Sequence, residues 1–270
     1  MISRKELIGM RGKAKAKALK GLMDDLMDNV VQDPEKLAEF VEKWQGGFYH
    51  YSFNNMILIM FQKPEASLLA GYKQWQTKYN RQVKKGERAI SVLAPRVWKK
   101  PVIKADGTED TEEILYFKPV SVFDITQTEG DPVDVGCSSY VHGDIEYEAV
   151  KAACPYKVVE KNMGAANGAT DGKTIWITPK ENEAAMSATL MHEWGHCKLH
   201  YPDKHVARNI KEIEAETVSY IVTTFFGLDN EKAKYYVGNW QNGDHLEHGR
   251  GKKILSVAES IIKTVTGEKR

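Results

Sequence analysis

Cysteine is scarce in this sequence, and the few cysteines form no recognisable pair. Cys137, Cys154 and Cys197 make no CxxC motif and no even set of disulfide partners, which is typical of a reducing compartment and argues against a cysteine metal site. No run of about eighteen apolar residues is present, so the sequence predicts no membrane-spanning helix. The N-terminal residues are charged and lack the apolar segment of a secretory signal. These absences predict a cytoplasmic protein with no membrane partner.

A strong charge of one sign is also missing. The 38 basic and 37 acidic side chains leave a net charge of +1, so only local charge can indicate a binding partner. With 42% hydrophobic and 28% charged residues, the composition is that of a globular protein. The length of 270 residues is sufficient for two domains of ordinary size.

The period of the apolar residues changes along the chain. Helical spacing predicts helices at residues 14–27, 35–44, 52–61, 145–153, 182–200 and 206–226. Alternation predicts strands at residues 89–94, 97–103, 114–123, 156–160 and 173–178, with a polar hairpin-like loop at 104–110. We place a domain boundary at 135/136, within a segment rich in Gly, Asp, Pro and Ser. The prediction is an α+β protein: helices on an antiparallel sheet (1–135), then a mainly helical domain with a small sheet (136–270).

The sequence HEWGH at residues 192–196 predicts a metal centre. His192 and His196 are four residues apart on a predicted helix, so their imidazoles project from one face and can share an ion. A bound zinc ion lowers the pKa of its water to roughly 7, and Glu193 lies where it can take the proton as general base. The alternative is a surface helix that happens to carry two histidines.

A metal centre of this kind needs a third protein ligand, and the following predicted helix has three glutamates that could provide it. Glu212 and Glu216 share a helix face, whereas Glu214 points away from them. We expect Glu212 to be the third ligand and Glu216 to accept a hydrogen bond from a ligand histidine. Two histidines and one carboxylate leave a position for water, which is the catalytic arrangement. A solvated acidic turn is the alternative.

The neighbouring residues are expected to have lesser roles. Cys197 is predicted to be a buried thiol, and His200 either contacts the site without ligating or lies at the surface. Residues 175–176 belong either to an edge strand beside the cleft, where a peptide could pair, or to an ordinary core strand. No role is assigned to the C-terminal helix predicted within residues 249–270, or to His205, His245 and His248.

The metal motif resembles that of a known family. The sequences HEWGHCKLH at 192–200 and EIEAE at 212–216 are similar to the HExGHxxLH…ExEA arrangement of ImmA/IrrE-type metallopeptidases, which are zinc-dependent and gluzincin-like. The resemblance implies Zn²⁺ held by His192, His196 and Glu212, with manganese or another divalent ion left open. Trp194 stands where the family usually has a small aliphatic residue.

Although the net charge of the whole chain is close to zero, one segment is strongly basic. Residues 63–104 contain eleven basic and two acidic side chains, a net charge of +9. Interleaved with these charges are four aromatic residues, Tyr72, Trp75, Tyr79 and Trp98. Basic groups that follow a phosphate backbone and aromatic rings that stack on bases are typical of proteins that bind single strands. The alternative is that the rings are core and the lysines form a solvated face.

Several segments of this half resemble one family. NNMIL (54–58), GYKQW (71–75), VKKGERAI (83–90) and VFDITQTEG (122–130) are similar, in the same order, to the N-terminal domain of ArdC-type antirestriction proteins. In that family the domain binds single-stranded DNA, and it is paired with an HExxH metallopeptidase-like domain in ArdC-like and LtrC-like proteins. Arg81 stands where a glycine is common. We expect DNA contacts from Lys73, Trp75, Lys78, Arg81, Lys84, Lys85 and Arg88.

These resemblances imply a single-stranded-DNA-binding zinc metallopeptidase of a plasmid, phage or conjugative element, with a role in protection from restriction. Two alternatives remain open. One is a non-catalytic protein that binds single-stranded DNA and has a structural zinc site. The other is an ImmA-like regulator that cleaves a repressor. The sequence does not identify the protein or peptide substrate.

Overall fold

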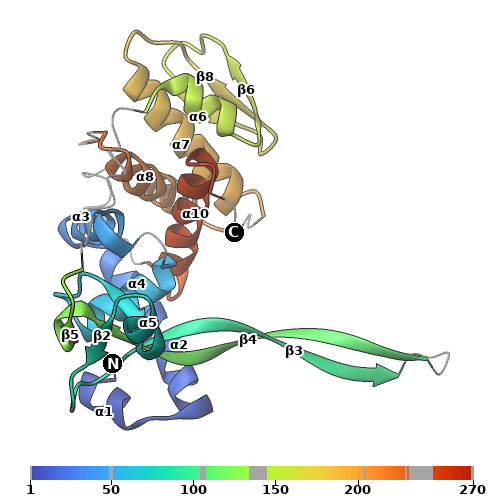
Figure 1. Ribbon diagram of the computed structural model, residues 1–270. Helices are drawn as coiled ribbons and strands as arrows, with labels where there is room; N and C mark the ends of the chain where they lie inside the picture. Colours follow the sequence, from blue (N-terminus) through green and yellow to red (C-terminus); the bar gives the residue numbers. More distant parts are fainter. Residues whose placement is uncertain are drawn as a thin grey trace. The chain divides into compact units, whose positions relative to one another are not determined.

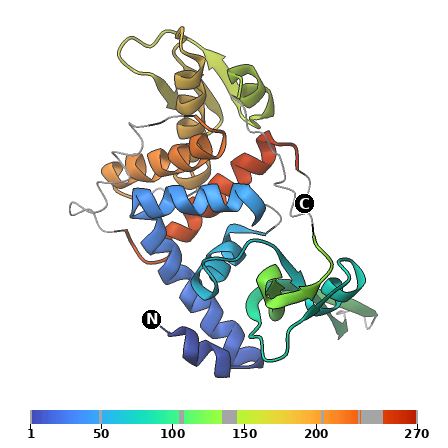
Figure 2. The same cartoon turned by 60° about the vertical axis from the view of Figure 1, so that its left-hand side comes forward.

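The computed structural model describes residues 2–48, 51–103, 108–133, 145–202, 205–228, 230 and 246–268 (Figures 1 and 2). The predicted boundary at 135/136, His245 and much of the predicted loop at 104–110 lie outside these residues. The fold is α+β, as predicted: two of the sheets are antiparallel, and the third, a small one, is mixed. No helix in the described part of the chain is long and apolar enough to cross a membrane.

The chain forms two compact units. Unit 1 comprises Met1–Met23 and Asn54–Val135, and unit 2 comprises Asp24–Phe53 and Gly136–Arg270. Residues 24–53 therefore belong with the C-terminal unit, although they precede the predicted domain boundary.

Unit 1 combines helices with two antiparallel sheets, ordered β1-β4-β3 and β2-β5. Its elements are α1 (Arg4–Gly9), the first part of α2 (Gly12–Val31), most of α4 (Phe53–Gln62), β1 (Leu69–Gly71), α5 (Tyr72–Thr77), β2 (Arg81–Val83), β3 (Ile90–Ile103), β4 (Glu109–Asp124), the 3₁₀ turn η2 (Ile125–Gln127) and β5 (Thr128–Gly130). Strands β3 and β4 form one long ribbon, in register from Ile90 opposite Val122 to Ile103 opposite Glu109. Pro95, which separated two predicted strands, is accommodated because β3 is an edge strand.

Side-chain amides of α4 cover the buried end of β3. Asn55 accepts a hydrogen bond from the backbone N–H of Leu93 (2.8 Å) and donates to its carbonyl (3.0 Å). Gln62 does the same for Ser91, at 2.9 Å in both directions. These two side chains replace a neighbouring strand and satisfy the backbone groups of the edge.

Unit 2 is mainly helical, with one small sheet. Its elements are the end of α2, α3 (Pro34–Lys43), the π-helical turn η1 (Trp44–Phe48), α6 (Tyr147–Ala153), β6 (Lys157–Glu160), β7 (Gly168–Thr170), β8 (Thr174–Ile177), α7 (Glu183–Leu199), α8 (Arg208–Phe225) and α10 (Arg250–Val265). The strand order is β6-β8-β7. Residues 175–176 therefore lie in the central strand, and the edge-strand alternative is wrong for them; β7 is an edge.

The last helix is anchored by a residue of α2. The carboxylate of Asp28 accepts hydrogen bonds from the backbone N–H groups of Gly249 and Gly251, each at 2.8 Å. These groups are the unpaired donors at the start of α10, where a negative charge is also favoured by the helix dipole. A Cβ at Gly251 would lie 2.7 Å from the Asp28 carboxylate, so the contact requires glycine.

We predict that Asp28→Ala lowers the free energy of unfolding by about 1–2 kcal/mol, because a buried helix cap is lost. Urea denaturation of the full chain measures the effect. Asp24→Ala is the matched control, since it removes only a half-exposed ion pair with Lys252 (2.9 Å) and should cost under about 1 kcal/mol. Equal losses in the two variants would contradict the capping role.

Candidate functional site

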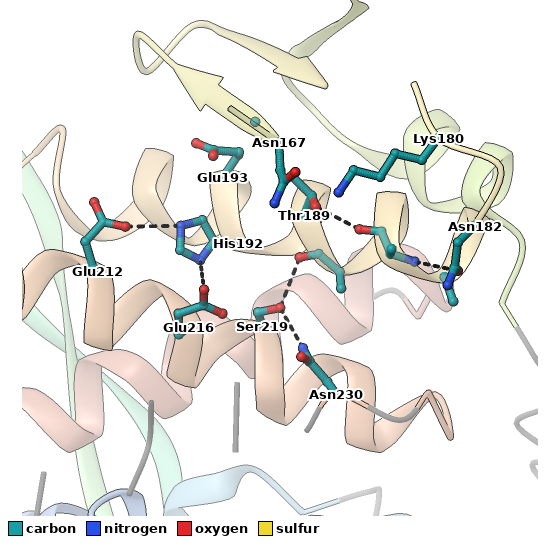
Figure 3. Close-up of a pocket in the computed structure, with 14 residues that line it drawn as sticks. Asn167, Lys180, Asn182, Thr189, His192, Glu193, Glu212, Glu216, Ser219 and Asn230 are labelled. Atoms are coloured by element: carbon teal, nitrogen blue, oxygen red, sulfur yellow. Dashed lines mark hydrogen bonds and ion pairs between the residues drawn. The ribbon is translucent and has the colours of Figure 1, made fainter. Parts of the chain in front are cut away.

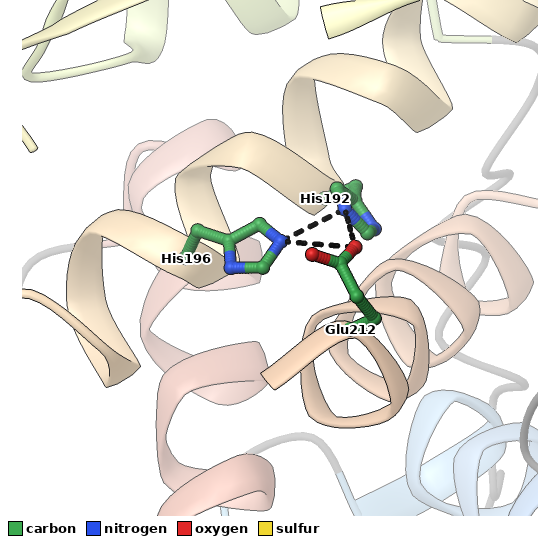
Figure 4. A group of neighbouring side chains, drawn as sticks. All are labelled: His192, His196 and Glu212. Atoms are coloured by element: carbon green, nitrogen blue, oxygen red, sulfur yellow. Dashed lines mark hydrogen bonds and ion pairs between the residues drawn. The ribbon is translucent and has the colours of Figure 1, made fainter. Parts of the chain in front are cut away.

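Three predicted ligand side chains converge in unit 2 (Figure 4). The Nε2 atoms of His192 and His196 are 3.0 Å apart. An Oε2 oxygen of Glu212 lies 3.5 Å from the first and 3.6 Å from the second. Two imidazole nitrogens and one carboxylate oxygen are a donor set suited to zinc and related divalent ions. The residues present therefore fit such an ion.

The crossing of two helices creates this arrangement. α7 presents both histidines one turn apart, and α8 presents the carboxylate from the opposite side (Figure 4). Gly195 lies at the crossing, where an added Cβ would already be 3.4 Å from the Val218 side chain and 3.6 Å from the Cα of Ala215. These are ordinary van der Waals distances, so α7 and α8 pack in direct contact at this position.

His192 lies between two carboxylates. In addition to Glu212, an oxygen of Glu216 is 3.5 Å from its Nδ1 atom (Figure 3). Burial lowers the pKa of His192, but the two carboxylates outweigh it and raise the pKa to about 9. Hydrogen bonding to the two histidines holds the pKa of Glu212 far below its usual value. A metal ion entering the site must therefore displace a proton, as metal binding to histidine generally does.

The other ligand histidine is oriented by a chain of hydrogen bonds. His200 has a pKa lowered chiefly by burial and is neutral. Its Nε2–H donates to Glu214 (2.9 Å), so its Nδ1 atom accepts the proton of His196 Nδ1 (2.9 Å). This arrangement leaves the Nε2 lone pair of His196 directed at the candidate site, which is the tautomer that ligation needs.

The chain of hydrogen bonds ends at a buried ion pair. Glu214 is 0% exposed, and Arg250 of α10 donates to both of its oxygens, from Nε at 2.6 Å and from Nη2. Burial raises the pKa of Glu214, but hydrogen bonds from His200 and Arg250 more than offset this and lower it. The prediction that Glu214 points away from Glu212 agrees with this position. No role for Arg250 was predicted from the sequence, where it is simply an arginine that precedes the amphipathic pattern of the C-terminal helix.

A cleft of about 540 Å³ contains the candidate site (Figure 3). Glu193 lines it and is 7% exposed, and burial raises the pKa of its carboxyl. Gly168 of β7 faces Glu193 closely, since a Cβ there would lie 2.8 Å from Glu193 Oε1. Polar groups line the remainder of the cleft, which the sequence did not predict: Asn167, Lys180, Asn182, Thr189, Ser219 and Asn230.

The cysteine beside the motif is structural, as expected. Cys197 is 4% exposed, its Sγ atom lies 3.1 Å from Thr170 Oγ1, and burial raises the pKa of the thiol.

The predicted DNA-contacting residues of unit 1 divide into two groups. Five have exposed side chains: Lys73, Lys78, Lys84, Lys85 and Arg88. Trp75 is 0% exposed, and its indole N–H donates to the Phe123 carbonyl (2.9 Å). It therefore has no ring face open to a base, contrary to the stacking role predicted for it. Of the four aromatic residues in the basic stretch, Tyr72 (46%) and Trp98 (53%) are exposed.

Arg81 also has a structural position. Its guanidinium donates to the Thr128 hydroxyl (2.7 Å), the Thr128 carbonyl (3.0 Å) and the carbonyls of Gly130 (3.1 Å) and Asp131. These bonds join β2 to β5 and the residue after it, so most of the donors are already used within the protein.

Comparisons with known proteins relate this chain to ArdC antirestriction proteins. Residues 22–123 match the family model of the N-terminal domain of anti-restriction factor ArdC. The uncharacterized protein pXO2-81 of Bacillus anthracis is 26% identical over 89% of this chain and 51% of its own length, so the chain spans about half of that curated relative.

Crystal structures of the antirestriction ArdC protein from plasmid R388 have a similar fold. The metal-free structure has a TM-score of 0.53 at 20% identity, covering 92% of this chain and 99% of ArdC. The Mn(II)-bound structure has a TM-score of 0.52 at 20% identity, covering 91% and 97%. Residues 22–123 are thus similar to the ArdC N-terminal domain, and the chain has a fold similar to that of the ArdC protein over nearly its whole length.

Proposed function

We propose that this protein is an ArdC-like antirestriction factor of a mobile element that binds single-stranded DNA and has a divalent-metal peptidase centre. The observation that carries the peptidase part is the convergence of His192, His196 and Glu212, two of which, His192 and Glu212, line a cleft together with Glu193. The motif favours Zn²⁺, and the Mn(II)-bound ArdC structure supports a divalent ion of this class. A DNA partner implies action in the cytoplasm.

The positions of the site residues support a role in peptide hydrolysis. A divalent ion, when bound, supplies Lewis acidity toward water and a carbonyl group. Glu193 is buried with a raised pKa, so its carboxylate is suited to take a proton from water and deliver it to the departing amine. β7 is an edge strand, and Gly168 lines the cleft. An extended peptide would therefore pair with β7 beside Glu193.

A non-catalytic protein with a structural metal is the second candidate, and the geometry disfavours it. Structural zinc sites are usually closed by four protein ligands. Among the described residues, three donors form the cluster, and they face a cleft large enough for a substrate.

The DNA-binding part rests on unit 1. Its match to the ArdC N-terminal domain includes the exposed basic residues Lys73, Lys78, Lys84, Lys85 and Arg88. Lys84, Lys85 and Arg88 follow β2 within five residues, which concentrates positive charge for phosphate contacts.

We predict that Glu193→Gln lowers cleavage of an unfolded protein substrate at least about 100-fold, because the proton acceptor is lost, while metal and DNA binding stay unchanged. Cleavage should be measured with zinc or manganese, with and without single-stranded DNA. Glu183→Gln, at the exposed start of the same helix, is the matched control. A wild-type protein that binds metal and DNA but cleaves nothing would favour the non-catalytic candidate.

The two carboxylates around His192 should differ in their effect on metal affinity. Glu212→Gln removes a ligand and should abolish tight binding, whereas Glu216→Gln removes a hydrogen-bond acceptor and should weaken binding about 10–100-fold. Titration of the metal-free protein with Zn²⁺ and Mn²⁺ measures both. The opposite ranking would show that Glu216 is the ligand.

The basic residues after β2 should determine DNA affinity through phosphate contacts. We predict that Lys84→Gln and Arg88→Gln each lower the salt dependence of single-stranded DNA binding, by about one unit of slope per lost contact. Fluorescence anisotropy at several salt concentrations measures the slope. Lys157→Gln, an exposed lysine of unit 2, is the control, and an equal change there would contradict a local site.

A further inference from the structure

The outer part of the β3–β4 ribbon lies outside any core. β1 pairs with β4 only at residues 122–124, so residues 95–103 and 109–117 pair only with each other. Figure 1 shows this part as an arm that extends away from the helices of unit 1. Six large apolar side chains on it are 41–78% exposed: Val97, Trp98, Ile103, Leu115, Tyr116 and Phe117. A two-stranded ribbon has little stability of its own, and exposed apolar groups in such numbers mark a binding surface.

The β3 edge of the arm is unsuited to pairing with another strand. At its base the edge of β3 is already covered by Asn55 and Gln62. Farther out, Pro95 and Pro101 have no backbone N–H to offer to an added strand. The β3 edge therefore offers little to an added strand, and the exposed large side chains of the arm lie on the two faces of the ribbon.

The register separates the side chains of the arm into two different faces. Arg96 is opposite Tyr116, Trp98 is opposite Ile114, and Ala94 is opposite Lys118. Residues two apart and directly opposite share a face. We call this surface the basic-aromatic face, formed by Ala94, Arg96, Trp98, Ile114, Tyr116 and Lys118. The other surface, the apolar face, is formed by Pro95, Val97, Leu115 and Phe117.

Charge distinguishes what each face can bind. The basic-aromatic face, as defined, carries two cations and no acid. Acidic residues on that side begin farther out, where Glu112 is 4.0 Å from Lys100. The apolar face is flanked by α2, whose Lys20 Nζ lies 5.4 Å from the centre of the Phe117 ring. Residues 2–23 of the same unit contain seven basic side chains and one acidic side chain, which adds positive potential around the base of the arm.

We propose that the basic-aromatic face is a second contact surface for single-stranded DNA, which rests on the DNA binding proposed above. Trp98 and Tyr116 stack on bases, and Arg96 and Lys118 contact the phosphates that flank them. Aromatic rings alternating with cations on one surface match the alternation of bases and phosphates in an unpaired strand. In a duplex the base faces are already stacked on each other, so the rings select for the single strand. This surface is distinct from the one formed by residues 73–88.

Anisotropy titrations of a labelled oligothymidine of about 20 nucleotides, at several salt concentrations, test the inference with the full chain. Trp98→Ala should weaken binding on the order of tenfold, with little change in salt dependence, because a stacked base is lost. Trp98→Phe should retain most of the affinity. Arg96→Gln should lower the slope of the salt dependence by about one.

Controls on the same arm separate this role from folding. Lys99 is on the opposite side of the ribbon, 3.2 Å from Glu113, so Lys99→Gln should leave DNA binding unchanged. Val97→Ser changes the apolar face and should also bind normally. Circular dichroism and thermal melts establish that each variant is folded.

Each other outcome overturns the inference. If the wild type binds DNA and Trp98→Ala and Arg96→Gln bind equally well, the ribbon is not part of the DNA-binding surface. The proposed function would then remain intact. An equal loss in Val97→Ser and Trp98→Ala assigns the effect to the fold of the arm. A wild type that does not bind single-stranded DNA overturns both this inference and the DNA-binding part of the proposed function.

Discussion

The close crossing of α7 and α8 is the constraint on which the metal centre depends. The two histidines belong to one helix and the carboxylate to the other, so a ligand set exists only where the helices approach closely. Gly195 lies at this crossing, where Val218 and Ala215 of α8 are within van der Waals distance of its Cβ position. Trp194, beside it in sequence, is fully buried, so the same turn of α7 serves both the core and the site.

A second requirement comes from the buried charges behind the site. A carboxylate removed from water is costly unless its hydrogen bonds are complete, and Glu214 is satisfied by His200 and Arg250 together. Loss of Arg250 leaves the charge of Glu214 uncompensated, and loss of His200 removes one of its hydrogen bonds. The orientation of a ligand histidine is thus linked to the position of α10, which is in turn held by Asp28.

Local patterns in the sequence were sufficient to predict the features that depend on the spacing of residues along one helix. The four-residue interval predicted the shared face of His192 and His196, and the glutamate spacing separated Glu214 from Glu212. Contacts between distant segments were not predictable in the same way. Arg250 meets Glu214 across 36 positions, and Trp75 is buried because Phe123 accepts its indole N–H. Composition alone did not distinguish that core tryptophan from the exposed Trp98.

The anchoring of α10 by α2 has a consequence for synthesis of the chain. Asp28 is separated by 223 positions from Gly251, and Gln45 by 180 from the Phe225 carbonyl to which it donates. At about 5–20 residues per second, α10 leaves the ribosome roughly 10–45 s after Asp28. During that interval, residues 24–53 cannot form their contacts with α10. Unit 2, and with it the complete support of His196, therefore forms only after α10 has been synthesised.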